Sequence, residues 1–199
     1  MSLLEIAAVV SSALGIWLMT RRALTSWPVT LLACGLYAEV FHQAKLYSDM
    51  LLQGVFAAFC IYGWWHWYRG VREEGAVRVE ALGWRGKLGG VAVGIVGSVL
   101  LGSVMARYTD AALPHMDAAL TAFSLVAQWW TTRKYLENWM LWIGVDILYT
   151  GIFVYKNLYL TAGLYAFFVV LAVLGLRSWQ KAMTEQQGSE AMAPADASA

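Results

Sequence analysis

The chain has 199 residues, of which 60% are hydrophobic and only 14% are charged. Soluble domains carry about a quarter charged residues, so this composition excludes an ordinary water-soluble domain and favours an integral membrane protein. The formal net charge of +1 provides no basic surface for nucleic acid. Cys34 and Cys60 both lie in apolar stretches, which predicts small buried side chains rather than a disulfide framework.

Seven stretches are predicted to be membrane-spanning helices, since a span needs about 20 mainly apolar residues. In chain order they cover residues 3–20, 27–43, 49–68, 88–107, 116–132, 137–155 and 158–179. The first stretch is predicted to be a retained span rather than a cleaved signal, because Arg21 and Arg22 follow it and no basic residue precedes it. The second, fifth and sixth are the weakest by hydropathy, because they carry Glu39, Gln128 and Asp146.

The polar segments between and after these helices predict the orientation of the chain. Residues 69–87 are expected to be a cytoplasmic loop, and residues 182–199 a disordered tail. Basic residues concentrate on one side of the predicted bundle, which places the C-terminus in the cytoplasm and the N-terminus outside. On the cytoplasmic side lie Arg21, Arg22, Arg69, Arg72, Arg78, Arg85, Lys87, Arg133, Lys134, Arg177 and Lys181, and on the other side Lys45, Arg107 and Lys156.

A gapless repeat relates the two halves of the chain at an offset of 112 residues. We expect three-helix copies at 1–68 and 113–181, with the helix at 88–107 as the extra crossing that keeps both copies parallel. Parallel repeats are a transporter architecture in which substrate binds near the midplane, although a duplicated scaffold without a pathway is the alternative. The identical pairs include Trp27 and Trp139, Leu36 and Leu148, Tyr37 and Tyr149, Phe41 and Phe153, Gly63 and Gly175, and Trp67 and Trp179.

Two blocks of the second copy carry a family resemblance. They read ENWMLWIGVD at 137–146 and LYLTAGLY at 158–165, and they resemble the signature of the PnuC family of bacterial vitamin transporters. The resemblance covers residues 1–181 and implies an all-α, SWEET-like three-plus-one-plus-three fold in the inner membrane, as a homotrimer. It also implies facilitated diffusion of nicotinamide riboside, which an intracellular kinase traps as its phosphate. Relatives are thought to carry thiamine or riboflavin, so the vitamin stays open.

Asp146 is the leading candidate for substrate binding, because an ionised carboxylate in the middle of a spanning helix is costly and is usually functional. A carboxylate among aromatic rings suits a flat cationic ligand such as nicotinamide riboside or thiamine, whereas riboflavin carries no positive ring. The alternative is that Asp146 pairs with a buried tyrosine, amide or backbone group and only stabilises the fold. At helical spacing the same face carries Trp139, Trp142, Tyr149 and Phe153.

Polar residues on the neighbouring helices complete the predicted site. Gln128 replaces an isoleucine of the first copy, which fits either an asymmetric site or interhelical packing. Asn138 either caps the sixth helix or reaches the substrate. Gln53 and its repeat counterpart Tyr165 are candidates from the third helix of each copy, and Tyr37 is a candidate from the second.

Other classes of protein lack their motifs. No G-x-x-x-x-G-K-[ST] phosphate loop occurs, and the three histidines have no metal-ligand spacing. We therefore expect no enzyme activity, metal or cofactor. Two further alternatives remain: a transporter that couples uptake to protons through Asp146 or Glu39, and a membrane scaffold that transports nothing.

Overall fold

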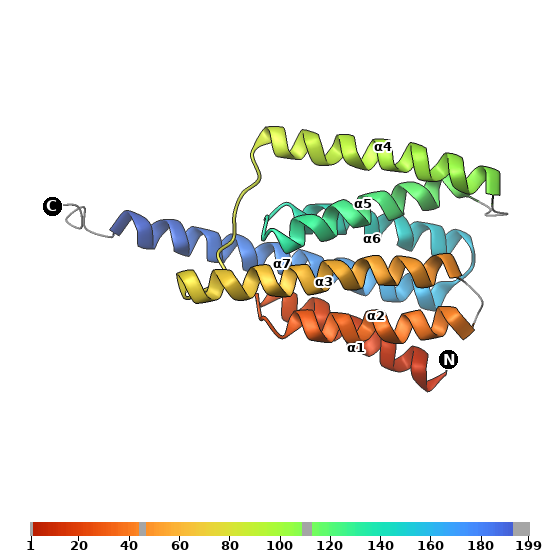
Figure 1. Ribbon diagram of the computed structural model, residues 1–199, viewed down its shortest axis with the longest axis horizontal. Coiled ribbons are helices and arrows are strands. Elements are labelled where there is room, and N and C mark those ends of the chain that lie inside the picture. The colour runs from red at the N-terminus through yellow and green to blue at the C-terminus, as the bar shows by residue number, and fades with distance from the viewer. Residues whose placement is uncertain (1, 44–46, 109–112, 193–199) are drawn as a thin grey trace.

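The computed structural model describes residues 2–43, 47–108 and 113–192, and its helices all run along the long axis of one bundle (Figure 1). α1 begins and α7 ends at opposite ends of this bundle. The seven helices that the sequence predicts are confirmed. They are α1 (Leu3–Thr20), α2 (Ser26–Gln43), α3 (Tyr47–Glu74), α4 (Trp84–Tyr108), α5 (Pro114–Thr132), α6 (Asn138–Tyr155) and α7 (Tyr159–Met192).

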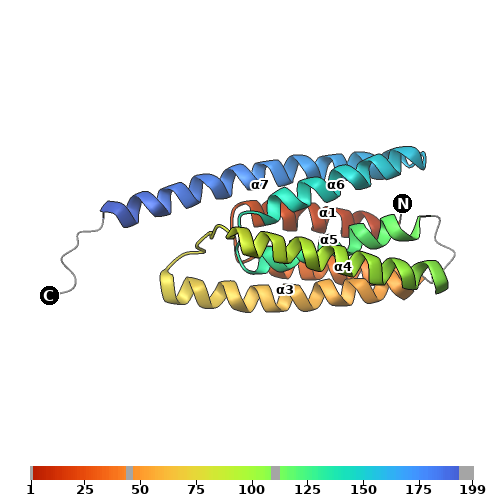
Figure 2. The same cartoon turned by 90° about the horizontal axis from the view of Figure 1, so that it is seen from above.

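Two helices continue beyond their predicted ends. α3 reaches Glu74, so the segment 69–87 is only partly a loop, and α7 reaches Met192, so the prediction of a disordered tail from 182 is wrong as far as 192. Residues 193–199 lie outside the described residues. Figure 2 shows both extensions projecting beyond the other helices. Hydropathy marks only the apolar part of a helix, whereas ion pairs one turn apart, Arg69 with Glu73 and Lys181 with Glu185, support the polar continuations.

The helices pack mainly against their neighbours in the chain. α1, α2 and α3 pack in sequence, as do α5, α6 and α7, and the two sets meet where α1 contacts α7 and where α3 contacts α5. α4 packs on α5 and on no other helix of the described residues, and it lies at the edge of the bundle (Figure 1). The linking helix therefore does not hold the two sets together.

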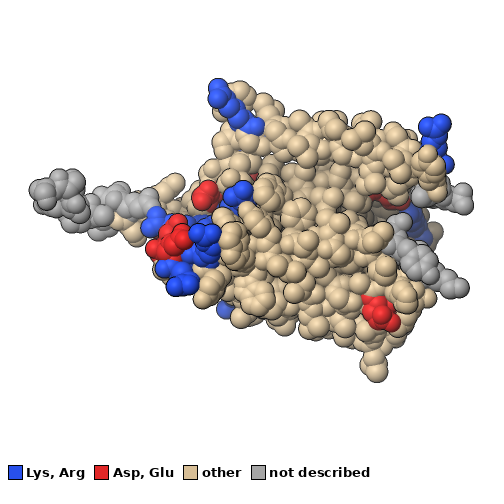
Figure 3. Space-filling view, in the orientation of Figure 1, with Lys and Arg blue, Asp and Glu red and all other residues tan. Residues whose placement is uncertain are grey.

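The surface fits a bilayer. By length and apolar composition, α1, α4 and the part of α7 from Tyr159 to Ser189 qualify as membrane-crossing helices. Charged residues on the face shown in Figure 3 lie mainly at the two ends, with a largely uncharged band between them. Leu88, Val93 and Leu100 of α4 are among the large apolar side chains that lie exposed, as expected for side chains in contact with lipid.

Four buried tryptophans form the centre of the core. Trp27 of α2 meets Trp67 of α3 edge to face, with ring centroids 5.2 Å apart, and Trp139 of α6 meets Trp179 of α7 in the same way at 5.4 Å. The Trp67 and Trp179 rings lie 5.7 Å apart and join the two sets of helices. We call these four residues the tryptophan cluster. Its two halves are related by the 112-residue offset, and so are their contacts.

Hydrogen bonds cross between the two sets at the same place. Trp67 donates its indole N–H to the carbonyl of Thr132 at the end of α5, at 3.2 Å. Trp179 donates to the carbonyl of Met19 near the end of α1, at 3.1 Å. Each third-helix tryptophan thereby binds the first helix of the opposite set, which fixes both sets at this end of the bundle.

Two glycines make room for the tryptophan cluster. A Cβ atom on Gly63 would overlap the Trp27 ring, and one on Gly175 would lie 2.7 Å from the Trp139 ring. Real Cβ contacts are longer than this, so any larger residue forces the indoles apart. The glycine and tryptophan pairs of the repeat therefore have one packing explanation.

Gly63→Ala and Gly175→Ala should each destabilise the protein by about 1–3 kcal/mol, because the added methyl overpacks a filled core. Gly54→Ala and Gly163→Ala are matched controls in the same helices, since their Cβ atoms would meet nothing within 4 Å. The controls should be neutral or gain up to about 1 kcal/mol from the better helix propensity of alanine. Thermal unfolding in detergent measures these stabilities. Equal melting temperatures for the two core variants and the two control variants would contradict the packing.

Candidate substrate-binding site

Asp146 lies in the middle of α6, eight residues after the helix begins at Asn138 and therefore about 12 Å along its axis. Its side chain is buried, with 6% of the residue exposed. Within the described part of the chain its carboxylate has no hydrogen bond and no ion pair. A carboxylate that only stabilised the fold would have such a partner, because burying an unpaired charge is expensive. Asp146 is therefore a candidate ligand-binding group.

Two aromatic rings, Tyr149 of α6 and Tyr165 of α7, lie near Asp146. Tyr149 and Tyr165 lie with ring centroids 4.8 Å apart, and Phe153 lies 5.1 Å from Tyr165. Asp146 is close enough to both tyrosines for its charge to act on their phenol groups. We call Asp146, Tyr149, Phe153 and Tyr165 the α6–α7 group. It combines one carboxylate with three aromatic rings that contact one another, and the sequence predicts Tyr149 and Phe153 on this face of α6.

Tyr37 brings the first set of helices to the same place. It lies on α2, near Tyr165, and its hydroxyl is close to Ser12 of α1. Its ring stacks on Phe41 at 5.9 Å, which repeats the contact of Tyr149 with Phe153 at 6.0 Å. The two sets thus present equivalent aromatic pairs, while only the second adds an acid.

Trp142 is linked to α5 by hydrogen bonds. Its indole N–H donates to the hydroxyl of Thr131 at 3.3 Å, and that hydroxyl lies 3.2 Å from the side-chain oxygen of Asn138. The amide nitrogen of Asn138 donates to the carbonyl of Tyr135 at 2.6 Å. Asn138 is the first residue of α6 rather than its cap, and Glu137 holds the cap position. Its polar atoms serve this internal network, which sequence reasoning did not identify.

The other predicted residues have no hydrogen bond or ring contact with the α6–α7 group in the described part of the chain. Trp139 belongs to the tryptophan cluster, where Gly175 and Trp179 cover it, so it is a packing residue in this structure. Gln128 is buried on α5 and its amide makes no hydrogen bond within the described residues. Gln53 is half-buried on α3. Substrate contact by Gln128 and Gln53 stays a prediction.

Comparison of the two sets at the repeat offset shows where their chemistry differs. At five positions around the site the second set has polar or aromatic side chains, and the first set has mostly apolar or smaller ones. This one-sidedness is the signal that could have identified Thr131 from the sequence. The pairs are Gln128 and Ile16, Thr131 and Met19, Asn138 and Ser26, Trp142 and Thr30, and Asp146 and Cys34.

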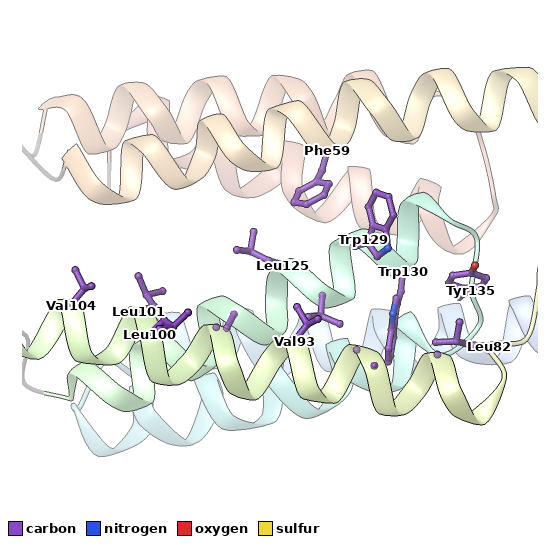
Figure 4. Close-up of a pocket in the computed structure, with 16 residues that line it drawn as sticks. Phe59, Leu82, Val93, Leu100, Leu101, Val104, Leu125, Trp129, Trp130 and Tyr135 are labelled. Carbon is purple, nitrogen blue, oxygen red and sulfur yellow. The ribbon is translucent and has the colours of Figure 1, made fainter.

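An apolar hollow lies away from these residues and is unsuited to a polar vitamin. A groove of about 900 Å³ runs along α4 between α3 and α5, with Phe59, Val93, Leu125 and Trp129 pointing into it (Figure 4). None of the predicted site residues lines it, and its lining has no acid and no side-chain amide. A polar ligand needs a few placed polar groups, so this groove is an apolar surface beside α4 and not the candidate site. No group of three or more metal-ligating side chains occurs among the described residues.

The described structure is an apolar helical bundle with a buried, unpaired carboxylate on one of its helices, as expected for a membrane transporter. The profile of the nicotinamide mononucleotide transporter family matches residues 2–181. The chain therefore belongs to this family, the PnuC family that the sequence blocks resemble.

Individual relatives agree with this assignment. The nicotinamide riboside transporter PnuC of Escherichia coli is 28% identical and spans 96% of this chain and 90% of its own length. The riboflavin/roseoflavin transporter RibM of Streptomyces davaonensis is also 28% identical, over 88% of this chain and 81% of its own. The crystal structure of the vitamin B3 transporter PnuC superposes with a TM-score of 0.74 at 26% identity, covering 92% of this chain and 82% of that one. These relatives are transporters and not enzymes, in agreement with the prediction from the motifs.

Asp146→Asn should leave the ligand-free protein as stable as the wild type or more stable, because an amide costs less than an unpaired carboxylate at a buried position. Glu137→Gln is the matched control. Glu137 is also buried, but it pairs with Lys87 at 2.8 Å and accepts from the backbone N–H of Leu82 at 2.9 Å. The control should lose about 1–3 kcal/mol. Melting temperatures in detergent decide the matter, and a loss for Asp146→Asn equal to that of the control would show that Asp146 serves the fold.

Proposed function

We propose that the protein takes up nicotinamide riboside by facilitated diffusion. The observation that carries this proposal is the unpaired carboxylate of Asp146 within the α6–α7 group. Nicotinamide riboside has a permanently positive aromatic ring, which an anion attracts and aromatic faces stack against. The relative from Escherichia coli, which spans nearly the whole chain, is named for this substrate.

The proposed binding mode uses the groups near Asp146. The cationic ring lies between Tyr149, Trp142 and the carboxylate of Asp146, and Tyr37 approaches from the first set of helices. Gln128 and Gln53 are the amides that donate to and accept from the carboxamide and ribose hydroxyls. Asn138, Trp139 and Tyr165 contribute through packing and hydrogen bonds around this centre.

The transport cycle uses the two sets of helices as parallel three-helix repeats linked by α4. The equivalent tryptophan and tyrosine contacts at the 112-residue offset support this arrangement. Substrate enters from outside, binds between the repeats, and the repeats rock to open inward. Phosphorylation by an intracellular kinase then traps the vitamin, so uptake needs no coupled ion.

The setting of the protein is part of the proposal. We place it in the bacterial inner membrane with its N-terminus outside, because the basic residues of the connections favour a cytoplasmic C-terminus. Assembly as a homotrimer is the expectation from the family resemblance. The mass of the purified complex, corrected for detergent, tests it, and a monomeric mass would contradict it.

Calorimetric titration of the purified protein with nicotinamide riboside, thiamine and riboflavin tests the substrate. Nicotinamide riboside should bind, and Asp146→Asn should weaken it at least about tenfold, or about 1.4 kcal/mol, because the positive ring loses its buried counter-charge. Glu39→Gln is a control with the same chemical change at an exposed site. Unchanged affinity in a well-folded Asp146→Asn protein would remove this residue from the site. Tight binding of thiamine instead would keep the cation site and change the vitamin.

Riboflavin is the second candidate, because the relative from Streptomyces davaonensis is named for it. Its ring system carries no positive charge, so the carboxylate of Asp146 should not favour riboflavin binding as it favours nicotinamide riboside binding. Riboflavin binding should be little changed or strengthened by Asp146→Asn. A protein that binds riboflavin alone, with this response, would replace nicotinamide riboside as the substrate.

Uptake into vesicles separates facilitated diffusion from the alternatives. Nicotinamide riboside should equilibrate across the membrane at the same rate with and without an imposed pH gradient. Acceleration by an inward proton gradient that disappears in Asp146→Asn or in Glu39→Gln would establish proton coupling. Absence of uptake of all three vitamins by well-folded protein would favour a scaffold.

A further inference from the structure

The hydrogen bonds between α5 and α6 form a directed chain. Asn138 is fully buried, and its amide nitrogen is used by the carbonyl of Tyr135. Its side-chain oxygen has one donor in the described structure, the hydroxyl of Thr131. Buried acceptors are normally satisfied, so the single proton of Thr131 points to Asn138 rather than to the carbonyl of Ala127 at 2.9 Å. This leaves the lone pairs of the Thr131 oxygen facing Trp142.

The indole of Trp142 depends on this arrangement for its only polar contact in the described structure. Its N–H donates to the Thr131 oxygen at 3.3 Å. Trp142 is half-buried and stands one turn before Asp146 on the same face of α6. This hydrogen bond therefore restricts the rotation of an indole that stands one turn from the carboxylate.

The first repeat has no equivalent of the Asn138–Thr131–Trp142 hydrogen bonds among the described residues. The counterparts of Thr131 and Asn138 are Met19 and Ser26, which make a weak contact from hydroxyl to sulfur at 3.6 Å. The counterpart of Trp142 is Thr30, whose hydroxyl bonds back to the carbonyl of Ser26 at 2.8 Å. In the second repeat these positions form a chain of hydrogen bonds that ends on the indole of Trp142. In the first repeat the same positions carry no aromatic ring.

We propose that Thr131 is a positioning residue that orients Trp142 for stacking on the aromatic ring of the substrate. Asn138 orients the Thr131 hydroxyl in turn, so the second repeat alone recognises the ring. This inference rests on the proposed function, because it takes the ligand to lie against Trp142 and Asp146.

Thr131→Val removes the hydroxyl at nearly constant volume and should weaken nicotinamide riboside binding about tenfold, because the indole loses its fixed orientation. Thr131→Ser restores the hydroxyl and should return the affinity to within about twofold of the wild type. Ser26→Ala deletes a buried hydroxyl at the Asn138 position of the first repeat. The Ser26→Ala protein should bind within about twofold of the wild-type affinity, even if the melting temperature of this variant falls.

A double-mutant cycle with Trp142→Phe separates positioning from a general structural effect. Phenylalanine keeps a stacking ring but has no N–H to donate to the Thr131 hydroxyl, so Thr131 cannot orient it. In that background Thr131→Val should cause no further loss of affinity. A second loss of about tenfold would mean that Thr131 acts independently of Trp142, and the inference would be overturned.

The same measurements distinguish failure of this inference from failure of the proposed function. If Trp142→Phe weakens binding while Thr131→Val does not, the site stands and the positioning role falls. If neither Trp142→Phe nor Asp146→Asn changes the affinity, the site itself is misplaced and both fall. If the wild-type protein does not bind nicotinamide riboside, the substrate is wrong and the inference falls with it.

Discussion

The contact between Trp67 and Trp179 is the interaction on which the arrangement of the two repeats depends. The linking helix α4 touches only α5 among the described helices, so it cannot align the repeats. The alignment comes instead from two third-helix indoles that pack together and donate across to Thr132 and Met19. Buried aromatic pairs with satisfied N–H groups combine a large apolar area with a fixed geometry. These contacts therefore hold the two sets of helices together at this end of the bundle.

That packing has a consequence for the proposed transport cycle. The tryptophan cluster fills the space between the repeats at the end that carries most of the basic residues. A substrate held at Asp146 reaches that side only if the indole pairs separate. Gly63 and Gly175 pack each tryptophan pair within its own set of helices. The proposed rocking motion therefore has to break the Trp67–Trp179 contact and the hydrogen bonds to Thr132 and Met19.

The repeats share their packing and differ in their chemistry. Tryptophans, tyrosines and glycines at the 112-residue offset make equivalent contacts in both sets of helices. The acid, the amide and the threonine around Trp142 occur in one repeat only. A vitamin has no two-fold symmetry, so two identical half-sites would leave polar groups without partners on one side of it. Polar groups of this kind on one set of helices only therefore suit a small asymmetric ligand.

The sequence by itself determined the class of protein, the seven helices and the pairs at the 112-residue offset, because lipid exposure and duplication leave marks along the chain. It also identified Asp146, since an acid within an apolar helix is conspicuous without any knowledge of its neighbours. Only the tertiary structure showed that Asp146 has no partner, that Trp139 is a packing residue although it shares a face of α6 with Tyr149, and that Thr131 bonds Trp142. Helical spacing gives the direction of a side chain but not the groups that meet it from other helices. The polar continuation of α7 was decided in the same way, by Ala182 packing into the core and by Gln186 accepting from the backbone of Val79.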